Sequence, residues 1–194
     1  MSCAHFSLTT DLLLSAYRRG IFPMADDAGR ITWHDPDPRA VFDLERLTIP
    51  SRLARYVRAN GFAFRIDMAF GAVIRGCAER EPRWISEEMI HVYSELHRLG
   101  HAHSVEVWNG GSLLGGIYGI AIRGAFFGES MFSCAPNASK AAFFHLAAHL
   151  RSRGFILFDT QYLNAHTASL GAFEIPRQRF RAELMAALEL SAEF

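Results

Sequence analysis

The fold is decided by HSVEVWNGGSLLGGIYGIAIRGAFFGESMF, residues 103–132. His103–Trp108 alternates polar and apolar side chains, which is typical of a half-buried strand. Asn109-Gly110-Gly111 follows, and these residues favour a hairpin because they tolerate the positive φ of a tight turn. Leu113–Ile122 and Ala125–Phe132 continue the pattern, so we expect an antiparallel meander.

The residues far upstream of the meander predict short elements. Apolar spacing predicts a helix over Asp11–Arg19 that Gly20 ends, and Phe22-Pro23 is expected to turn the chain. Ile31–Trp33 is expected to form a short strand. The following Asp35-Pro36-Asp37-Pro38 must be a loop, because proline fits neither a helix interior nor a strand ladder.

Helices and strands are also expected directly beside the meander. Before it we expect a strand at 62–66 and helices at 69–79 and 86–100; after it we expect helices at 138–153, 165–170 and from 178, with strands at 155–158 and 173–175. This order predicts the α+β class. We expect a small N-terminal lobe of residues 1–61 and a larger domain of residues 62–194.

Composition limits the classes of protein to which the chain can belong. Half of the 194 residues are hydrophobic, which suffices for a real core. We see no apolar run near the roughly 20 residues of a membrane span and no secretory signal at the N-terminus, so we expect a cytoplasmic protein. Cys3, Cys77 and Cys134 are isolated from one another, which predicts reduced thiols rather than disulfides or a zinc site.

The charges are balanced overall but unevenly distributed. The formal net charge is +0, which argues against indiscriminate binding of nucleic acid. From Arg46 to Ile66, however, five arginines occur without any acidic residue. Arg52, Arg55 and Arg58 would follow one side of a helix that begins at Pro50-Ser51; with Arg65 they could meet RNA phosphates, or they could form an ordinary solvated helix face.

Polar side chains follow apolar residues in segments around Glu129, Asp159 and His166. A buried carboxylate or amide without a partner is costly, so such a concentration indicates a functional site. Asp159 and Gln161 are two apart and would share one face of a strand. Glu129 could join them, or it could pair with Lys140 or an arginine; His166 could equally be a packed or capping residue.

The chain resembles the leucyl/phenylalanyl-tRNA–protein transferase family over nearly its whole length. The matching motifs are Ala16–Pro23, Trp33–Ala40, Trp84-Ile85, Leu96–Trp108, Gly115–Gly119, Gly128–Ser133, Asn137–Lys140, Asp159–Gln161 and Glu174–Arg177. The resemblance implies an enzyme that transfers Leu, Phe and Met from aminoacyl-tRNA to proteins beginning with Arg or Lys, which creates an N-degron. It also implies a monomer and an acetyltransferase-like (GNAT) fold for the larger domain.

Acetyl-CoA itself is not expected as a cofactor. Enzymes that bind CoA on this fold carry an Arg/Gln-x-x-Gly-x-Gly/Ala turn whose amides hold pyrophosphate. The nearest candidate, Arg151–Ile156, ends a predicted helix and places Ile156 where a small residue is needed. A metal is not expected either, because His101 and His103 alternate on a strand rather than forming a helical pair of ligands.

The resemblance assigns roles to individual residues. Asp159 and Gln161 are implied to be catalytic and hydrogen-bonded to each other, and Glu129, Asn164 and His166 are expected near the acceptor peptide. The pocket for the transferred side chain is implied to consist of Ile117, Phe126, Leu146 and Phe158, and the contacts to the terminal adenosine of Tyr17, Trp33 and Trp84. Taken one by one, the apolar residues could equally be core and the aromatic residues anchors between lobes.

Two alternative functions remain open at this stage. One is a related aminoacyl-tRNA-dependent ligase with another donor or acceptor, such as a peptidoglycan-type transferase. The other is a binding module for RNA or peptide that has lost catalysis on the same scaffold. The presence of Asp159, Gln161 and Glu129 argues against lost catalysis.

Overall fold

The computed structural model describes residues 8–26, 28–81 and 83–194 and confirms the α+β class. Cys3 lies outside the described residues. The elements in chain order are α1 Thr10–Tyr17, β1 Phe22–Ala25, β2 Ile31–His34, β3 Arg39–Phe42, α2 Ser51–Ala59, β4 Ala63–Ile66, α3 Phe70–Ala78, α4 Glu87–Arg98, β5 Ala102–Asn109, β6 Ser112–Ile122, β7 Ala125–Ser133, α5 Ala138–Ser152, β8 Leu157–Gln161, α6 Ala165–Ser169, β9 Phe173–Ile175 and α7 Arg177–Leu188.

A mixed seven-stranded sheet organises the molecule, in the order β4-β5-β6-β7-β8-β3-β9. The expected meander is present as the antiparallel strands β5, β6 and β7. Gly110 and Gly111 form the hairpin loop with φ of 53° and 86°, the left-handed conformation that glycine adopts without a steric cost. Strands β7 and β8 pair in parallel, whereas the other neighbours in this sheet pair antiparallel.

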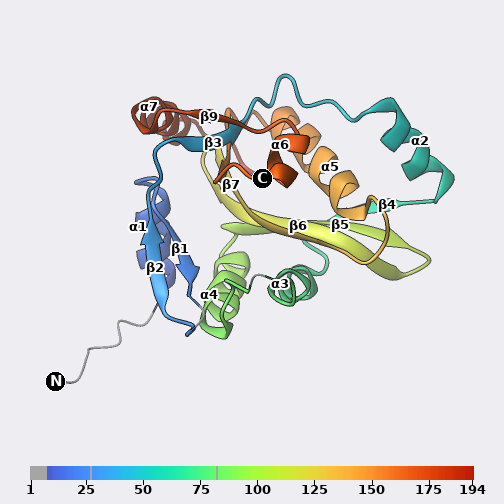
Figure 1. Cartoon of the computed structure of the whole chain (residues 1–194), viewed down its shortest axis with the longest axis horizontal. Coiled ribbons are helices and arrows are strands. Elements are labelled where there is room, and N and C mark those ends of the chain that lie inside the picture. The colour runs from blue at the N-terminus through green and yellow to red at the C-terminus, as the bar shows by residue number, and fades with distance from the viewer. Residues whose placement is uncertain (1–7, 27, 82) are drawn as a thin grey trace.

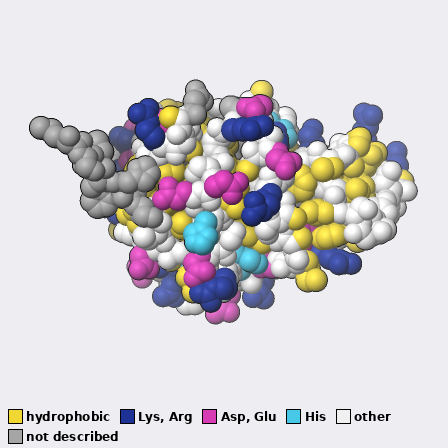
Figure 2. Space-filling view, turned by 90° about the horizontal axis from the view of Figure 1, so that it is seen from below, with side chains coloured by type: hydrophobic (Ala, Val, Ile, Leu, Met, Phe, Trp, Pro, Cys, Tyr) yellow, Lys and Arg dark blue, Asp and Glu magenta, His cyan; other side chains and the backbone are white. Residues whose placement is uncertain are grey.

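Helices cover both faces of this sheet (Figure 1). α5 packs on one face, where Phe143 and Leu146 join a core with Ile117, Phe126 and Phe158. α3 and α4 pack on the other face within a second core. Figure 2 views the α3–α4 side, where acidic and basic side chains are interspersed and hydrophobic side chains gather toward one end.

Two strands differ from the sequence-based expectation. Phe22-Pro23 does not turn the chain but begins β1, which pairs with β2 in a separate two-stranded sheet. Arg39–Phe42, for which no element was expected, forms β3 and lies between β8 and β9 in the large sheet. The division of the chain at residue 61 stays a prediction, but β3 shows that residues 1–61 contribute a strand to the large sheet.

Strand β8 also begins and ends later than expected. The apolar run suggested 155–158, whereas the strand runs from Leu157 to Gln161. The amide of Phe155 donates to the carbonyl of Leu150 at the end of α5, so Phe155 belongs to the helix terminus. The shift places Asp159 inside the sheet and Gln161 at its end. Among the described residues, no helix combines the length and apolar character that crossing a bilayer requires.

Candidate active site

The site lies where the parallel strands β7 and β8 diverge. They pair at Ala125 with Leu157, at Phe126 with Phe158 and at Phe127 with Asp159, and the pairing then ends although both strands continue. A cavity of about 400 Å³ lies beyond the last pair. Its lining residues are Met24, Phe42, Cys77, Arg80, Glu81, Trp84, Ile117, Gly128, Glu129, Ser130, Met131, Phe143, Phe158, Thr160, Asn164, His166 and Thr167.

A β-bulge directs Glu129 to this cavity. In the ladder between β6 and β7, Gly119 pairs with Gly128 and Tyr118 pairs with Ser130, so Glu129 is the extra residue. Gly119 permits this close approach, because a Cβ atom there would lie 2.2 Å from the carbonyl oxygen of Phe127. The bulge therefore frees the Glu129 side chain from the alternation of the strand.

Three donors hold the Glu129 carboxylate. The hydroxyl of Tyr17 donates to Oε1 at 2.7 Å, that of Tyr93 donates to Oε2 at 3.2 Å, and Gln161 Nε2 donates to Oε1 at 3.3 Å. The two tyrosine oxygens are also 2.6 Å apart. Burial raises the pKa of Glu129 to about 8; the Tyr17 hydrogen bond opposes this rise and the negative charge of Asp159 adds to it. Burial likewise raises the pKa of both tyrosines well above 10.

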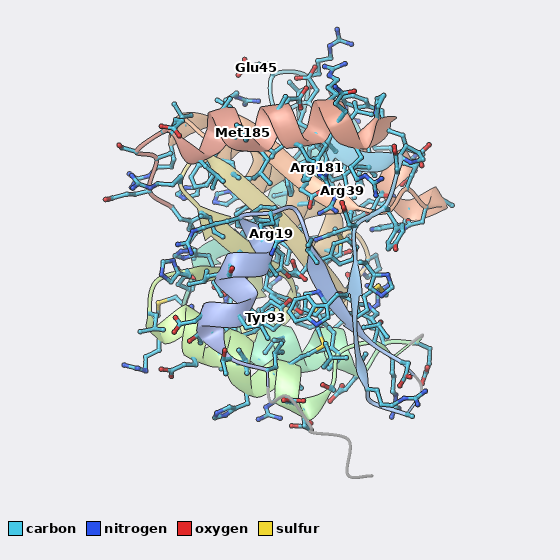
Figure 3. The ribbon with its side chains drawn as sticks, turned by 90° about the vertical axis from the view of Figure 1, so that its left-hand side faces the viewer. Arg19, Arg39, Glu45, Tyr93, Arg181 and Met185 are labelled. Atoms are coloured by element: carbon cyan, nitrogen blue, oxygen red, sulfur yellow. The ribbon has the colours of Figure 1, made fainter. Side chains whose placement is uncertain are left out.

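Asp159 lies behind the cavity in a buried ion pair with Arg39. Arg39 Nε donates to Oδ1 at 2.8 Å and Nη2 donates to Oδ2 at 2.7 Å, and both side chains are fully buried. A third bond joins Arg39 Nη1 to the carbonyl of Gly20 at 2.8 Å, and the guanidinium lies over the rings of Phe22 and Phe180. In Figure 3, Arg39 lies below α7 and Tyr93 lies near α4. Arg39 thus links Asp159 to the N-terminal part of the chain.

Gln161 connects Asp159 to Glu129. Its backbone amide donates to Asp159 Oδ1 at 3.1 Å, while its side-chain amide reaches Glu129. Its φ of 61° is in the left-handed region, which is uncommon for a residue with a side chain and often marks a functional site. Neither Asp159 nor Gln161 lines the cavity, although Thr160 between them does.

Asn164 and His166 do line the cavity, as Glu129 does. Asn164 Oδ1 accepts from the amides of His166 and Thr167 at 2.9 Å and so caps α6. His166 Nε2 lies 3.3 Å from the sulfur of Met131. Burial lowers the pKa of His166, and the positive charges of Arg80 and Lys140 lower it further.

The apolar wall of the cavity only partly coincides with the expected pocket. Ile117 and Phe158 line it, whereas Phe126 and Leu146 lie behind it in the core. The Phe158 ring packs against three others, with centroids 4.9 Å from Phe42, 5.6 Å from Phe126 and 5.7 Å from Phe143. Phe42 and Phe143 are lining residues that the sequence analysis did not include.

The three aromatic residues expected at the adenosine lie in different places. Trp84 lines the cavity. Trp33 lies on β2 with 40% of its surface exposed. Tyr17 is fully buried against Phe127, so in this structure its ring cannot stack on an adenosine, and its hydroxyl holds Glu129 instead.

The expected phosphate-binding arginines lie away from the cavity. Arg52, Arg55 and Arg58 are exposed on α2, which Figure 1 shows at the opposite end of the molecule from α1. Arg65 is exposed on β4 and lies over the ring of Trp108, 5.1 Å from its centroid.

Other catalytic chemistry would need metal ligands or reactive thiols among the described residues. No group of three or more His, Cys, Asp or Glu side chains among them could hold a metal ion. Cys77 and Cys134 are both free thiols. Cys77 lines the cavity, but burial raises its pKa to about 12 and so keeps it protonated.

Arg39 and Tyr93 are functional candidates that sequence reasoning missed. Arg39 directly precedes the apolar residues Ala40-Val41-Phe42, and a lone arginine at such a position was an available signal. Tyr93 lies within the helix expected at 86–100, and its hydroxyl meets Glu129 through tertiary structure alone, so no local pattern could single it out.

Comparison with known sequences decides the family. A sequence model described as leucyl/phenylalanyl-tRNA protein transferase matches residues 41–185, and a model of the N-terminal domain of the same proteins matches residues 6–37. This chain belongs to the leucyl/phenylalanyl-tRNA–protein transferase family. It is therefore an aminoacyltransferase, and the resemblance noted in the sequence is confirmed.

Individual relatives match this transferase along nearly all of its length. The leucyl/phenylalanyl-tRNA–protein transferase of Gloeobacter violaceus is 51% identical over 189 residues, which are 97% of this chain and 98% of that protein. That of Salinibacter ruber is 49% identical and covers 96% and 83% of the two chains. Among solved structures, L-PGS from Bacillus licheniformis aligns with a TM-score of 0.46 at 12% identity, covering 77% of this chain and 51% of that one.

Proposed function

We propose that this transferase moves Leu, Phe and Met from aminoacyl-tRNA to the α-amine of proteins beginning with Arg or Lys. The observation that carries the proposal is a cavity with an apolar wall on one side and the Glu129 carboxylate on another. The wall of Ile117, Phe42, Phe143 and Phe158 suits a large apolar side chain without a branch at Cβ. The product would carry a new apolar N-terminus and act as an N-degron.

The chemistry requires positioning more than activation. The ester between an amino acid and the ribose of tRNA is already activated, so aminolysis proceeds without ATP, a metal or another cofactor. Holding the amine against the ester carbonyl supplies most of the rate enhancement. We assign this orienting role to Gln161, whose side-chain carbonyl can accept from the amine, and we assign to Asp159 the role of fixing the Gln161 backbone.

The acceptor peptide is proposed to enter beside Glu129, Asn164 and His166. Glu129 and Glu81 both line the cavity, and each would pair with the cationic side chain of an N-terminal Arg or Lys when it is ionised. Asn164 and His166 lie at the start of α6 and form the neighbouring wall.

The tRNA is proposed to present its terminal adenosine to Trp84 and Trp33. Stacking on an aromatic ring contributes about 1 to 3 kcal/mol per base. We assign Tyr17 to holding Glu129 rather than to the base. Arg52, Arg55, Arg58 and Arg65 are exposed and available to phosphates further along the acceptor arm.

Three general features complete the proposal. We infer that the larger domain has an acetyltransferase-like (GNAT) fold, in line with the mixed sheet and the divergence of β7 from β8. We also infer that the enzyme works as a monomer. It is expected in the cytoplasm, where its aminoacyl-tRNA donors are made and used.

A transfer assay tests the proposed function. Labelled Leu-tRNA, Phe-tRNA or Met-tRNA is mixed with a protein beginning with Arg, without ATP, and label on the acceptor is measured. Acceptors that differ only in beginning with Ala or Glu should stay unlabelled. Transfer to these acceptors instead would favour the alternative ligase, and no transfer with any donor would favour a binding module.

A further inference from the structure

Ester aminolysis requires a group that takes up a proton. The amine nitrogen forms a bond to the ester carbonyl carbon, and the bond from that carbon to the ribose oxygen breaks. The nitrogen must lose one proton, and the departing ribose oxygen must gain one. A single group that accepts the first proton and returns it to the ribose oxygen balances both steps without another reactant.

Gln161 and Asp159 are poorly suited to this task. A side-chain amide is not basic near neutral pH, so Gln161 can orient the amine but cannot hold its proton. Asp159 is fully buried, and its two oxygens accept three donated bonds from Arg39 and the Gln161 amide. A proton on Asp159 would break the ion pair and leave the buried Arg39 charge unpaired.

Glu129 can both reach a bound amine and accept its proton. It lines the cavity, so its carboxylate is within reach of a bound amine. Its oxygens accept three hydrogen bonds, from Tyr17, Tyr93 and Gln161, whereas an ionised carboxylate has about four acceptor positions. Within the described part of the chain, one acceptor position on Oε2 therefore has no partner and is available to a substrate.

The two tyrosines form a cage that can hold an added proton. Three contacts join Tyr17 to Glu129, Tyr93 to Glu129 and Tyr17 to Tyr93, at 2.7, 3.2 and 2.6 Å. Each of the three contacts needs one hydrogen atom to be a hydrogen bond, but the two tyrosine hydroxyl groups supply only two. A proton on the Glu129 carboxylate supplies the third, so the protonated form satisfies the whole cage.

We propose that the Glu129 carboxylate accepts the proton of the attacking α-amine and returns it to the ribose oxygen. The inference rests on the proposed function, because it assumes that an aminoacyl ester and an amine meet in this cavity. It changes the role of Glu129 from binding the acceptor to taking part in the reaction. Gln161 and the two tyrosines are positioning residues in this scheme.

The electrostatics of the site agree with this role. The charged and titratable groups around Glu129 include Tyr17 on α1, Tyr93 on α4, Tyr118 on β6, Asp159 on β8 and Arg39 on β3. Cys77, Arg80, Glu81 and His166 line the same cavity. Burial is the main reason why the pKa of Glu129 rises to about 8. A pKa near the working pH suits a group that must both accept a proton and return it.

The test compares Glu129→Gln with the unchanged enzyme and with Glu79→Gln, which removes the same charge from an exposed position outside the cavity. Transfer is measured with saturating aminoacyl-tRNA and two acceptors. One acceptor is a protein that begins with Arg, and the other is a small amine without a charged side chain. For both acceptors kcat and KM are determined separately from pH 6 to pH 9. Thermal unfolding verifies that each variant is folded.

We expect Glu129→Gln to lower kcat about 100- to 10,000-fold with both acceptors, as is usual for loss of a general base. The rise of kcat with pH should disappear in this variant, and Glu79→Gln should behave as the unchanged enzyme. A fall in kcat of less than tenfold, or a change confined to KM for the Arg acceptor, overturns the proposal. If the unchanged enzyme transfers nothing, the proposed function fails instead.

Tyr93→Phe provides a second measurement should Glu129→Gln fail to fold. Loss of this hydroxyl removes one partner of the carboxylate but leaves Glu129 in place. The pH at which kcat rises should therefore shift, because that pH reports the carboxylate in the bound complex. An unchanged profile would assign the titration to the acceptor amine and overturn the proposal.

Discussion

Replacing Arg39 by methionine should destabilise the enzyme strongly. The change removes the two bonds to Asp159, at 2.8 and 2.7 Å, and the bond to the Gly20 carbonyl. It also leaves the carboxylate of Asp159 charged and buried. Breaking a buried ion pair from one side costs about 3 to 5 kcal/mol in free energy of unfolding. At about 2 to 4 °C per kcal/mol, a chain of this size should lose about 6 to 20 °C in Tm.

The matched control is Arg181→Met, which breaks an ion pair with Asp35 in which Arg181 is 53% exposed. Arg181 lies near Arg39 in Figure 3, but an exposed pair contributes only about 0 to 1 kcal/mol. Urea unfolding followed by tryptophan fluorescence gives both free energies. The double variant Arg39→Met/Asp159→Leu should regain much of the stability without regaining transfer. If Arg39→Met alone loses less than about 1 kcal/mol, our account of the ion pair is refuted.

Three further predictions concern the bulge, the apolar wall and the charge of the site. Gly119→Ala should lower the free energy of unfolding by about 1 to 3 kcal/mol or more, because the new Cβ meets backbone. The control, Gly71→Ala, has open space around its new Cβ and should be neutral or slightly stabilising when both variants are unfolded in urea. Ile117→Phe should narrow the cavity and lower kcat/KM at least tenfold more for Phe-tRNA than for Leu-tRNA. A smaller difference between the two donors would contradict the assignment of this wall. The raised pKa of Glu129 means that the folded state holds a proton that the unfolded state releases between about pH 4.5 and pH 8. The contribution of this group to stability therefore falls as pH rises through that range. Glu129→Gln should be more stable than the unchanged enzyme at pH 8.5 and similar to it at pH 4. If the two proteins have equal Tm values at both pH values, the pKa of Glu129 is not raised.

Local patterns were sufficient for much of the fold. The hairpin at Gly110 and Gly111 follows from the conformational freedom of two residues, and its strands follow from alternation along the chain. Helices α1 and α4 begin and end close to the expected residues because caps and glycines act over a few positions. Such features need no knowledge of distant parts of the molecule.

Distant pairing explains what local patterns could not predict. β3 is only four residues long, and its partners lie more than a hundred residues later in the chain. The bulge at Glu129 depends on the register between two strands, which alternation does not determine. Two residues that the resemblance singled out, Glu129 and Trp84, line the cavity. The resemblance could not show that Asp159 and Tyr17 are buried behind the cavity rather than facing it.

The place of β3 in the sheet also governs when the enzyme can become active during its synthesis. The strand leaves the ribosome early, yet both of its neighbours, β8 and β9, are made near the end. The outer edge of β3 stays open until β9 ends at residue 175. Before residue 161 has emerged, neither edge of Arg39–Phe42 has a strand beside it and Asp159 cannot meet its arginine. A nascent chain released before that point would therefore contain the whole meander and no working catalytic centre.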